Sequence, residues 1–280
     1  MKIRAEFALS CENNRIRKNK KLSFLLDELK KYKQKDEWIG DAIYSIDQNG
    51  DLYKQVIEFC SIYKKDIRLI KLGYSVEVTD EDRERAVAFY PSLPVYYCEE
   101  DWERVYEYDE CDFCYCKRRT DSCFHVQIKG YIKNHQNDYG MAGIDRAGGG
   151  ILLLPELVKK MILEGIHEKY FQPVYSRGKK LMGYTYITDN ILPEGALIDM
   201  NYRYLGKCPV CGGVKLKEIE EQYRFQPKKL KKDMLKYVQD VNFTYEFYDE
   251  YREIVVSKRV EEIIRKYVKY AEFIPIFLSE

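Results

Sequence analysis

The sequence predicts an α+β protein. A mixed α/β domain over residues 105–280, with two similar strand–helix–strand units, follows a largely helical region over residues 1–104. Three observations predict this fold. Two Cys-x-x-Cys pairs lie far apart in the chain, an apolar strand–helix–strand pattern follows each pair, and helical periodicity recurs in the N-terminal third. A chain of 280 residues is long enough to bury the core of one large domain or of two modest ones.

The first helical patterns occur early in the chain. Residues 15–35 predict a basic helix with a short apolar stripe, and residues 52–63 repeat the helical periodicity. The stripe of the first helix consists of Leu22, Leu25, Leu26 and Leu29. We expect each helix to lie on the core with its polar face in water.

A strand and another helix are expected next. Residues 67–78, IRLIKLGYSVEV, are typical of a strand. Thr79 and the three acidic residues after it predict the capped start of a helix over residues 81–90. Pro91 and Pro94 would end that helix, since proline cannot continue the backbone hydrogen bonding.

An acidic run, EEDWERVYEYDECD, covers residues 99–112. Such runs usually lie on a solvated face of a strand or helix, and we favour that interpretation. The alternative is a patch that meets a basic partner, with aromatic anchors inside a charged rim. The candidate partner-binding residues are Glu99, Glu100, Asp101, Trp102, Glu103 and Tyr106.

An apolar strand–helix–strand pattern occurs twice in the chain, and its first copy begins at residue 151. Residues 151–154 predict a short buried strand, and Pro155 suits the first turn of the helix that follows. Gly165 ends this helix, and residues 169–175 predict a second strand. The apolar stripe of the helix consists of Leu157, Val158, Met161 and Ile162.

The second copy lies near the C-terminus. Residues 254–256 predict a strand, Ser257 an N-cap, and residues 271–278 a closing strand. At a shift of 102 positions these pairs coincide: Val158 with Val260, Met161 with Ile263, Ile162 with Ile264, Phe171 with Phe273, and Pro173 with Pro275. The Cys pairs coincide at a shift of 97. We infer a degenerate internal duplication, with chance similarity of short apolar patterns as the alternative.

The two Cys pairs predict a metal site. Two thiolates three positions apart on a tight turn reach one ion, and the second pair is followed by the glycines that such turns favour. The favoured set is Cys111, Cys114, Cys208 and Cys211 around one zinc ion. A closed four-thiolate site leaves no position for substrate, so the ion would be structural and would clip the two units together.

Two alternatives to this site stay open. One is a local site that uses Cys111, Cys114, Cys123 and His125, and the other is that the cysteines are simple thiols. The first pair is the weaker half of the favoured site. It lacks the following glycine, and Cys116 offers a competing ligand.

Composition and charge limit the classes of function. The chain has 47 basic and 46 acidic residues, a net charge of +1, which argues against a general nucleic-acid binder because phosphate must be neutralised by excess Lys and Arg. No apolar run approaches the roughly 20 residues of a membrane span, and a signal-peptide core is lacking. We therefore expect a cytoplasmic protein, in which nine cysteines indicate thiols and metal instead of disulfides.

Catalytic motifs are not apparent. The three histidines, His125, His135 and His167, have no neighbour that suggests a nucleophile–base pair. No serine lies in a Gly-x-Ser-x-Gly turn, and no pair of carboxylates stands out. We expect a protein that is not an enzyme.

The order of these motifs resembles the double-CXXCG motif family of bacterial toxin–immunity proteins. A first Cys-x-x-Cys (CDFC) precedes a strand–helix unit (ILLLPELVKKMILEG), and a second (CPVCG) precedes the C-terminal strand, capped helix and strand (EIVVSKRVEEIIRKY and AEFIPI). The resemblance covers about residues 105–280 and departs from the pattern where the glycine after Cys114 is missing. It implies a cytosolic, non-enzymatic protein that binds and neutralises one cognate toxin, with the four cysteines as a structural feature.

Two functions from different classes follow. The favoured one is an immunity protein that binds a protein toxin, with a structural zinc ion and no membrane. The alternative is a zinc-ribbon module that binds nucleic acid or regulates. Its candidate basic faces are residues 15–35, 117–119 and 228–232.

Overall fold

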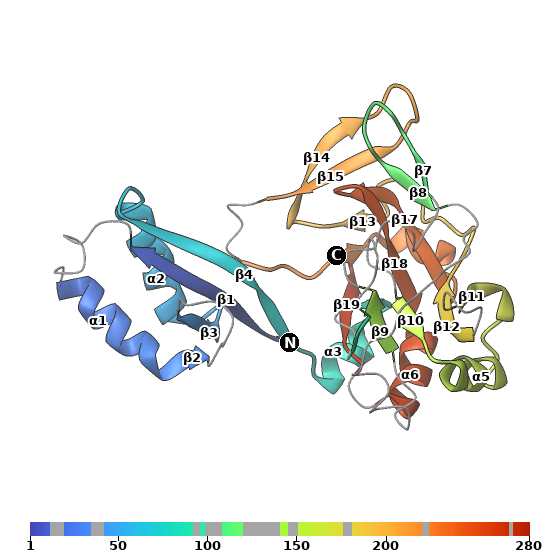
Figure 1. The fold of residues 1–280 in the computed structure, drawn as a ribbon, viewed down its shortest axis with the longest axis horizontal. Helices are drawn as coiled ribbons and strands as arrows, with labels where there is room; N and C mark the ends of the chain where they lie inside the picture. The colour runs from blue at the N-terminus through green and yellow to red at the C-terminus, as the bar shows by residue number, and fades with distance from the viewer. Residues whose placement is uncertain are drawn as a thin grey trace. The chain divides into compact units, whose positions relative to one another are not determined.

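A computed structural model gives the structure of the chain. It describes residues 1–11, 20–34, 42–91, 96–98, 108–119, 141–144, 151–175, 181–219, 224–268 and 271–280. The fold is mixed α/β, as the sequence predicts (Figure 1). The chain forms two compact units, Met1–Asp82 with Glu220–Gln226, and Arg83–Ile219 with Pro227–Glu280. This division falls near residue 82, whereas the sequence analysis places it at residue 104. In the part of the chain described, no helix is long and apolar enough to cross a membrane.

The first unit contains a four-stranded antiparallel sheet in the order β2-β3-β1-β4. Its strands are β1 (Lys2–Cys11), β2 (Lys33–Gln34), β3 (Ile43–Asp47) and β4 (Ile67–Glu77). The expectation of a largely helical region is therefore wrong for these residues. The physical reason is visible in β1, where Ile3, Ala5 and Phe7 are buried while Lys2 and Arg4 are exposed. That alternation has the period of a strand.

The predicted helices of the first unit are present. They are α1 (Lys20–Leu29), extended by the 3-10 turn η2 (Lys30–Tyr32), and α2 (Asp51–Ile62). The two helices contribute to one hydrophobic core with the sheet. Their buried side chains are Leu22, Leu25 and Leu29 on α1, and Tyr53, Val56 and Phe59 on α2. The ring of Phe7 lies 5.7 Å from those of both Tyr44 and Tyr53.

The capped helix after β4 is shorter than predicted. It is α3 (Asp80–Arg85), and Thr79 caps it: the Thr79 hydroxyl accepts from the Asp82 N–H at 3.2 Å, and Asp82 accepts from the Thr79 N–H at 3.0 Å. Residues 88–90, the expected end of this helix, instead form strand β5 (Ala88–Pro91) together with Pro91. The cause is tertiary, because β5 pairs with two strands from the C-terminus of the chain.

The second unit contains three sheets. The five-stranded sheet consists of β11 (Phe171–Tyr175), β12 (Leu181–Tyr186), β10 (Ile151–Leu153), β9 (Met141–Ile144) and β6 (Tyr96–Cys98), in that order. The eight-stranded sheet consists of β13 (Leu197–Ile198), β16 (Lys229–Leu230), β19 (Phe273–Leu278), β5, β18 (Tyr251–Ser257), β17 (Val241–Tyr248), β15 (Val214–Glu218) and β14 (Tyr202–Lys207). The third sheet is the hairpin of β7 (Tyr108–Glu110) and β8 (Lys117–Arg119).

The elements of both strand–helix–strand patterns form where the sequence predicts them. The first is β10, α5 (Pro155–Leu163), the 3-10 turn η4 (Glu168–Tyr170) and β11, and the second is β18, α6 (Lys258–Tyr267) and β19. A further 3-10 turn, η5 (Lys232–Tyr237), precedes β17. In neither pattern do the two strands pair with each other. β12 lies between β10 and β11, β5 lies between β18 and β19, and each inserted strand is antiparallel to both of its neighbours.

Each inserted strand comes from a part of the chain that precedes a Cys pair. β5 precedes the first Cys pair, yet it completes the sheet of β18 and β19, which follow the second pair. β12 precedes the second Cys pair, yet it completes the sheet of β10 and β11, which follow the first. Two prolines that coincide at the shift of 102 face these strands: Pro173 is opposite Tyr184, and Pro275 is opposite Phe89. Through β5, the start of this unit is joined to the sheet of its C-terminal strands.

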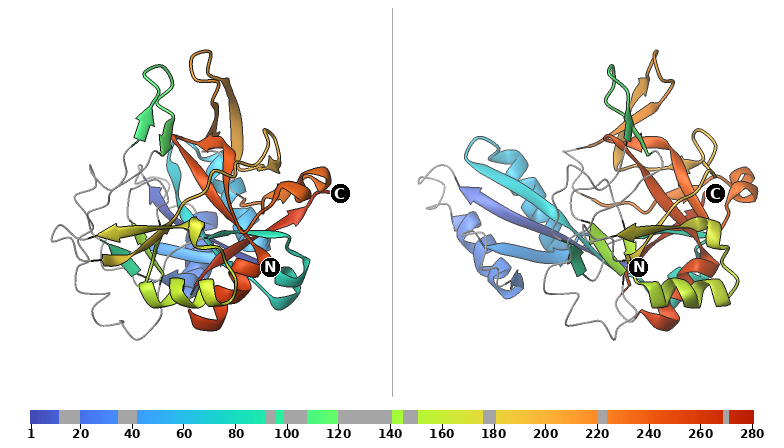
Figure 2. Two further views of the ribbon diagram at one scale, coloured as in Figure 1. Left: turned by 90° about the vertical axis from the view of Figure 1, so that its right-hand side faces the viewer. Right: turned by 45° about the vertical axis from the view of Figure 1, so that its right-hand side comes forward.

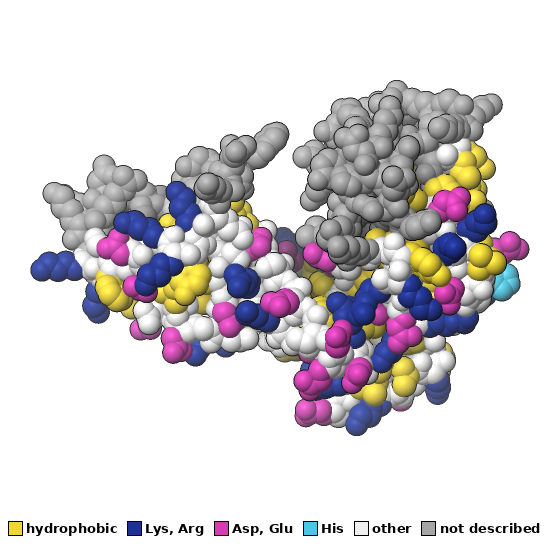
Figure 3. All heavy atoms as spheres, turned by 90° about the horizontal axis from the view of Figure 1, so that it is seen from below, with side chains coloured by type: hydrophobic (Ala, Val, Ile, Leu, Met, Phe, Trp, Pro, Cys, Tyr) yellow, Lys and Arg dark blue, Asp and Glu magenta, His cyan; other side chains and the backbone are white. Residues whose placement is uncertain are grey.

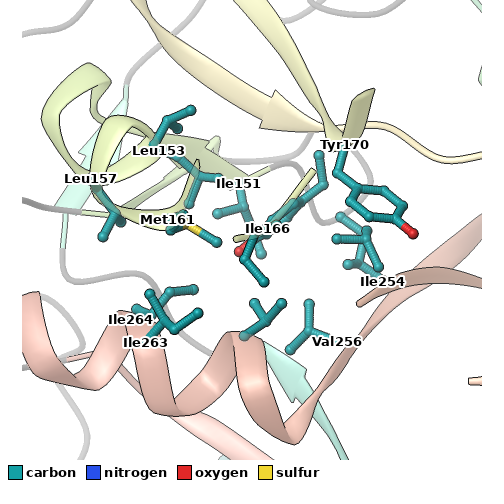
Figure 4. Close-up of a cluster of buried hydrophobic side chains, with 14 of the residues drawn as sticks. Ile151, Leu153, Leu157, Met161, Ile166, Tyr170, Ile254, Val256, Ile263 and Ile264 are labelled. Carbon is teal, nitrogen blue, oxygen red and sulfur yellow. The ribbon is translucent and has the colours of Figure 1, made fainter. Parts of the chain in front are cut away.

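Helices α5 and α6 share the largest core of the second unit (Figure 4). Leu157, Val158 and Met161 of α5 are buried with Val260, Ile263 and Ile264 of α6. Ile162, which was expected in the apolar stripe, is instead 40% exposed. The predicted helix ends are present. Pro155 lies in the first turn of α5, Gly165 has a φ of +90° after it, and the Ser257 hydroxyl accepts from the Val260 N–H at 3.3 Å.

Candidate metal centre

Four cysteines from two distant segments come together. The Sγ atoms of Cys111, Cys114, Cys208 and Cys211 all lie within 4.8 Å of one another. The Sγ atoms of Cys111 and Cys208 are 3.9 Å apart, and those of Cys114 and Cys211 are 3.6 Å apart. A tetrahedral zinc ion with Zn–S bonds of about 2.3 Å needs sulfur atoms roughly 3.8 Å apart. The four cysteines can therefore hold a metal ion such as zinc without rearrangement of the backbone.

Two hairpins carry the cysteines at their turns. β7–β8 holds the first pair and β14–β15 the second, and both hairpins project from the same end of the second unit (Figure 2). Their turns have the same hydrogen bonds at a shift of 97. The N–H groups of Tyr115 and Gly212 bond to the carbonyls of Cys111 and Cys208 at 2.8 and 2.9 Å. The N–H groups of Cys111 and Cys208 bond to the carbonyls of Cys116 and Gly213, two residues beyond the second cysteine of each pair, at 3.1 and 2.8 Å.

The missing glycine does not change the first turn. Tyr115 has a φ of +60° and Gly212, at the corresponding position, a φ of +69°. Both residues are therefore in the left-handed region, which glycine adopts freely and a residue with a Cβ adopts at a cost of about 1–2 kcal/mol. The tyrosine ring at this position is exposed. The turn of the first Cys pair thus has the same backbone geometry as the turn of the second, but it is strained at Tyr115.

The thiols of each pair differ in acidity. The N–H groups of Cys211 and Val210 point at the Cys208 sulfur and lower its pKa to about 6. The N–H groups of Cys114 and Phe113 lower the pKa of Cys111 in the same way. Burial raises the pKa values of Cys114 and Cys211 to about 11. The first cysteine of each pair is thus the more acidic one, with a pKa that favours the thiolate at Cys208, and the second would ionise when a cation binds.

Cationic side chains cross between the two hairpins. Arg118 Nη2 donates to the Cys211 carbonyl at 2.5 Å, and Lys215 Nζ donates to the Cys114 carbonyl at 3.2 Å. The Arg252 guanidinium lies 4.8 Å from the Phe247 ring, and its pKa is lowered by burial and by nearby Arg118. Four thiolates around one Zn²⁺ carry a net charge of about −2. The surrounding cations offset this charge and tie each hairpin to the other's metal turn.

Cys116 is close to the cluster but is not one of its four members. It is buried, and burial raises the pKa of its thiol. Gly213 holds the corresponding position of the second hairpin, where a Cβ would lie 3.0 Å from the Phe247 ring and 3.2 Å from the Cys211 sulfur. The two hairpins therefore differ in how this position is filled. Cys123 and His125, the ligands of the local alternative, lie outside the described residues.

The remaining site predictions concern the partner-binding residues and His167. The partner-binding candidates Glu99, Glu100, Asp101, Trp102, Glu103 and Tyr106 lie outside the described residues. His167 has a structural role, since its Nδ1 accepts from the Lys169 N–H at 3.1 Å and so caps η4. Sequence analysis missed Arg118, Lys215 and Tyr115 as parts of the metal centre. Alignment of the two hairpins at a shift of 97, which places Arg118 on Lys215, is the signal that could have found the two cations.

A buried ionic cluster in the same unit also escaped prediction. The Lys228 ammonium lies 3.3 Å from Asp199 Oδ2 and contacts the Glu253 carboxylate. It also lies 4.0 Å from the ring of Tyr248 and 4.7 Å from that of Tyr90. Burial raises the pKa of Glu253, and Lys228 opposes that rise. Through Lys228, this cluster holds the segment just before β16 against both β17 and β18. Its residues follow no periodic pattern in the sequence, so a sequence pattern does not predict it.

A comparison with models of protein families finds no match to this chain. Searches of curated proteins and of solved structures also find no match.

Proposed function

We propose that the protein is a non-enzymatic immunity protein that binds and neutralises a cognate bacterial toxin in the cytoplasm. The observation that carries the proposal is the order of motifs: a Cys-x-x-Cys hairpin, strand–helix–strand, a second Cys-x-x-Cys hairpin and a second strand–helix–strand. This order resembles that of the double-CXXCG motif family. The balance of 47 basic and 46 acidic residues supports a protein partner over nucleic acid.

The metal in this proposal is a structural zinc ion. Its four thiolate ligands would close the coordination sphere, which leaves no position for water or substrate. Cys111 and Cys208 are 97 residues apart, so the ion would join segments that local structure does not hold together. The matching hydrogen bonds of the two hairpins and the strand inserted in each strand–helix–strand pattern support a zinc-clipped domain built from two similar units.

The toxin-contact surface in this proposal is the acidic run. Its candidate residues are Glu99, Glu100, Asp101, Trp102, Glu103 and Tyr106. A patch of carboxylates with aromatic anchors suits a basic nuclease-like toxin domain. Replacement of the four acidic residues by lysine tests this surface, and unchanged protection would remove it from the proposal.

The experiment for the function is a rescue assay. The open reading frame next to this gene is expressed alone and together with this protein. Growth arrest by the neighbour alone, with growth restored through a stable complex on co-expression, supports the immunity function. A harmless neighbour, or one that kills regardless of co-expression, contradicts it.

A nucleic-acid-binding zinc ribbon is the second candidate function. The β14–β15 hairpin favours it, because Arg203, Lys207, Lys215 and Lys217 outnumber the single acidic residue Glu218, and Tyr204 is 61% exposed beside them. Exposed aromatic rings among cations are typical of single-strand binding surfaces. Salt-dependent binding of a single-stranded oligonucleotide, lost in a Tyr204→Ala variant, would support this function over the first.

A further inference from the structure

A groove runs between α1 and α2 on the surface of the first unit. It has a volume of about 420 Å³, and the two helices contribute all of its lining residues except Tyr63, which follows α2 directly. The lining residues are Lys20, Lys21, Phe24, Leu25, Gln55, Glu58, Phe59, Ile62 and Tyr63. The lining brings the start of α1 and the end of α2 to the same part of the groove. This groove is remote in sequence from the metal ligands and does not depend on the proposed function.

The apolar side chains of the groove form a floor and two rims. Leu25 and Phe59 are buried, and the Phe59 and Tyr63 rings are 4.6 Å apart, which makes a rigid apolar floor. Phe24 and Ile62, in contrast, are each 65% exposed. Large apolar side chains at opposite sides of one groove, both in water, mark a surface that is covered when a partner binds.

The charges around the groove select the partner. Lys20 and Lys21 line it, and Lys64 and Lys65 follow Tyr63 and are exposed. Glu58 is the one carboxylate among the lining residues. This part of the first unit therefore presents a local excess of positive charge beside an apolar groove. Figure 3 shows one face of this unit, on which hydrophobic side chains lie among Lys and Arg and also among Asp and Glu. A complementary partner has apolar side chains in its centre and carboxylates at its edge.

The exposed rims favour a helix over a small molecule. A small apolar anion in the groove would cover the floor and leave most of Phe24 and Ile62 in water. A helix laid along the groove would pack between α1 and α2 as a third helix, with its apolar stripe on the floor and its flanks against both rims. We propose that this groove binds an amphipathic, acidic helix of a partner protein, with Phe24 and Ile62 as apolar contacts and the lysines as charge contacts.

The probe is a synthetic helical peptide of about four turns, with Leu at helical spacing on one face and Glu on the other. A second peptide has the same Leu positions and Lys in place of Glu. Binding to the full chain is measured by fluorescence anisotropy of the labelled peptide, and its location by shifts of amide resonances. We expect saturable binding of the acidic peptide, with shifts confined to the groove residues, and at least tenfold weaker binding of the basic peptide.

Variants at exposed positions separate binding from folding. We expect a Phe24→Ala, Ile62→Ala double variant and a Lys20→Glu, Lys21→Glu double variant each to bind the acidic peptide about tenfold more weakly. The matched controls are Leu163→Ala on α5 and Lys231→Glu with Lys232→Glu, which change exposed residues of the same kinds in the second unit. They should bind as the native chain does. Circular dichroism confirms that each variant is folded.

Three outcomes would overturn the proposal. They are no saturable binding of the acidic peptide, equal binding of the two peptides, and binding that the groove variants leave unchanged. Two further arms identify a different occupant. Groove-dependent binding of vesicles with phosphatidylserine, without peptide binding, would assign the groove to an anionic membrane, and the same result with lauric acid would assign it to a fatty acid.

Discussion

Glu164 and Lys266 form an ion pair of 3.0 Å between the C-terminal ends of α5 and α6. They are 102 positions apart, which is the shift that superposes Val158 on Val260 and Pro173 on Pro275. The Cys111–Cys208 and Cys114–Cys211 contacts likewise join corresponding residues, at a shift of 97. Residues that correspond in the two sequence patterns therefore touch both beside the core and at the metal centre.

Removal of one thiolate tests the metal centre. In a Cys208→Ser variant we expect the zinc content to fall from about one ion per chain to near zero, and unfolding to occur at a lower temperature. Metal is measured by mass spectrometry, and unfolding by circular dichroism with and without a chelator. Cys60→Ser is the control, since Cys60 lies in the first unit outside the four-cysteine cluster. Equal metal content in the two variants would contradict the assignment.

Replacement of Tyr115 by glycine should relieve the backbone strain in the turn of the first Cys pair. Tyr115→Gly should stabilise the protein by up to about 1 kcal/mol, because glycine adopts a φ of +60° freely. Gly212→Ala should destabilise it by about 1–2 kcal/mol for the opposite reason. Among the described residues, apart from its two chain neighbours, the nearest atom to an added Cβ at Gly212 is Lys207 Cε at 4.0 Å, so the backbone angle sets that cost. Denaturant unfolding with zinc present measures both changes. A loss of stability in Tyr115→Gly would show that the exposed ring contributes more than the strain costs.

The inserted strand β12 is sensitive to added volume at Gly183. A Cβ there would lie 2.5 Å from the Leu153 carbonyl oxygen and 2.8 Å from Leu152 Cδ1. Because the first of these is a backbone atom of the paired strand β10, Gly183→Ala should cost about 1–3 kcal/mol of unfolding free energy. Gly73→Ala in β4 is the matched control, since nothing lies within 4 Å of its added Cβ. Equal stability of the two variants would contradict the close packing of β12 against β10 at Gly183.

The buried carboxyl group of Glu261 on α6 should make the stability of the protein depend on pH. Burial raises the pKa of Glu261, and its ion pair with Arg83, at 2.7 Å, opposes the rise. An acid with a raised pKa in the folded state stabilises the fold below its unfolded pKa, and this contribution is lost as pH rises through the folded pKa. The native chain should therefore gain stability relative to Glu261→Gln as pH falls from 7 towards about 4.3.

The measurement is the difference in unfolding free energy between the native chain and Glu261→Gln across this range. Glu262→Gln is the control, because Glu262 is the exposed neighbour on the same helix. Its difference from the native chain should show no comparable trend. A difference for Glu261→Gln that shrinks as pH falls would have the wrong sign.

Sequence patterns predicted the parts of the fold that depend on local interactions. The stripes of α1, α2, α5 and α6 have helical period, and the proline at the start of α5 and the Ser257 cap mark helix ends. The four cysteines were found because tight turns with two thiolates have a fixed spacing. Each of these patterns involves residues only a few positions apart, so it can be recognised in a single sequence.

Long-range pairing was not visible in the same way. Residues 88–90 continue the pattern of a capped helix, but pairing with β18 and β19, more than 160 residues away, makes them part of a strand. In β1 the signal is local, since its buried and exposed residues alternate with the period of a strand. The Lys228 cluster depends on residues from four separate segments, and only the folded chain brings them together.

The inserted strand β5 limits how this chain can be divided. A fragment that begins at residue 105, at the boundary expected from sequence, contains all four metal ligands and both helices of the shared core. It lacks β5, so β18 and β19 would have open hydrogen-bonding edges where a strand belongs. Such edges pair with any available strand, and the fragment would aggregate although its metal turns are intact. The smallest piece of this gene that encodes a soluble second unit therefore starts before Ala88.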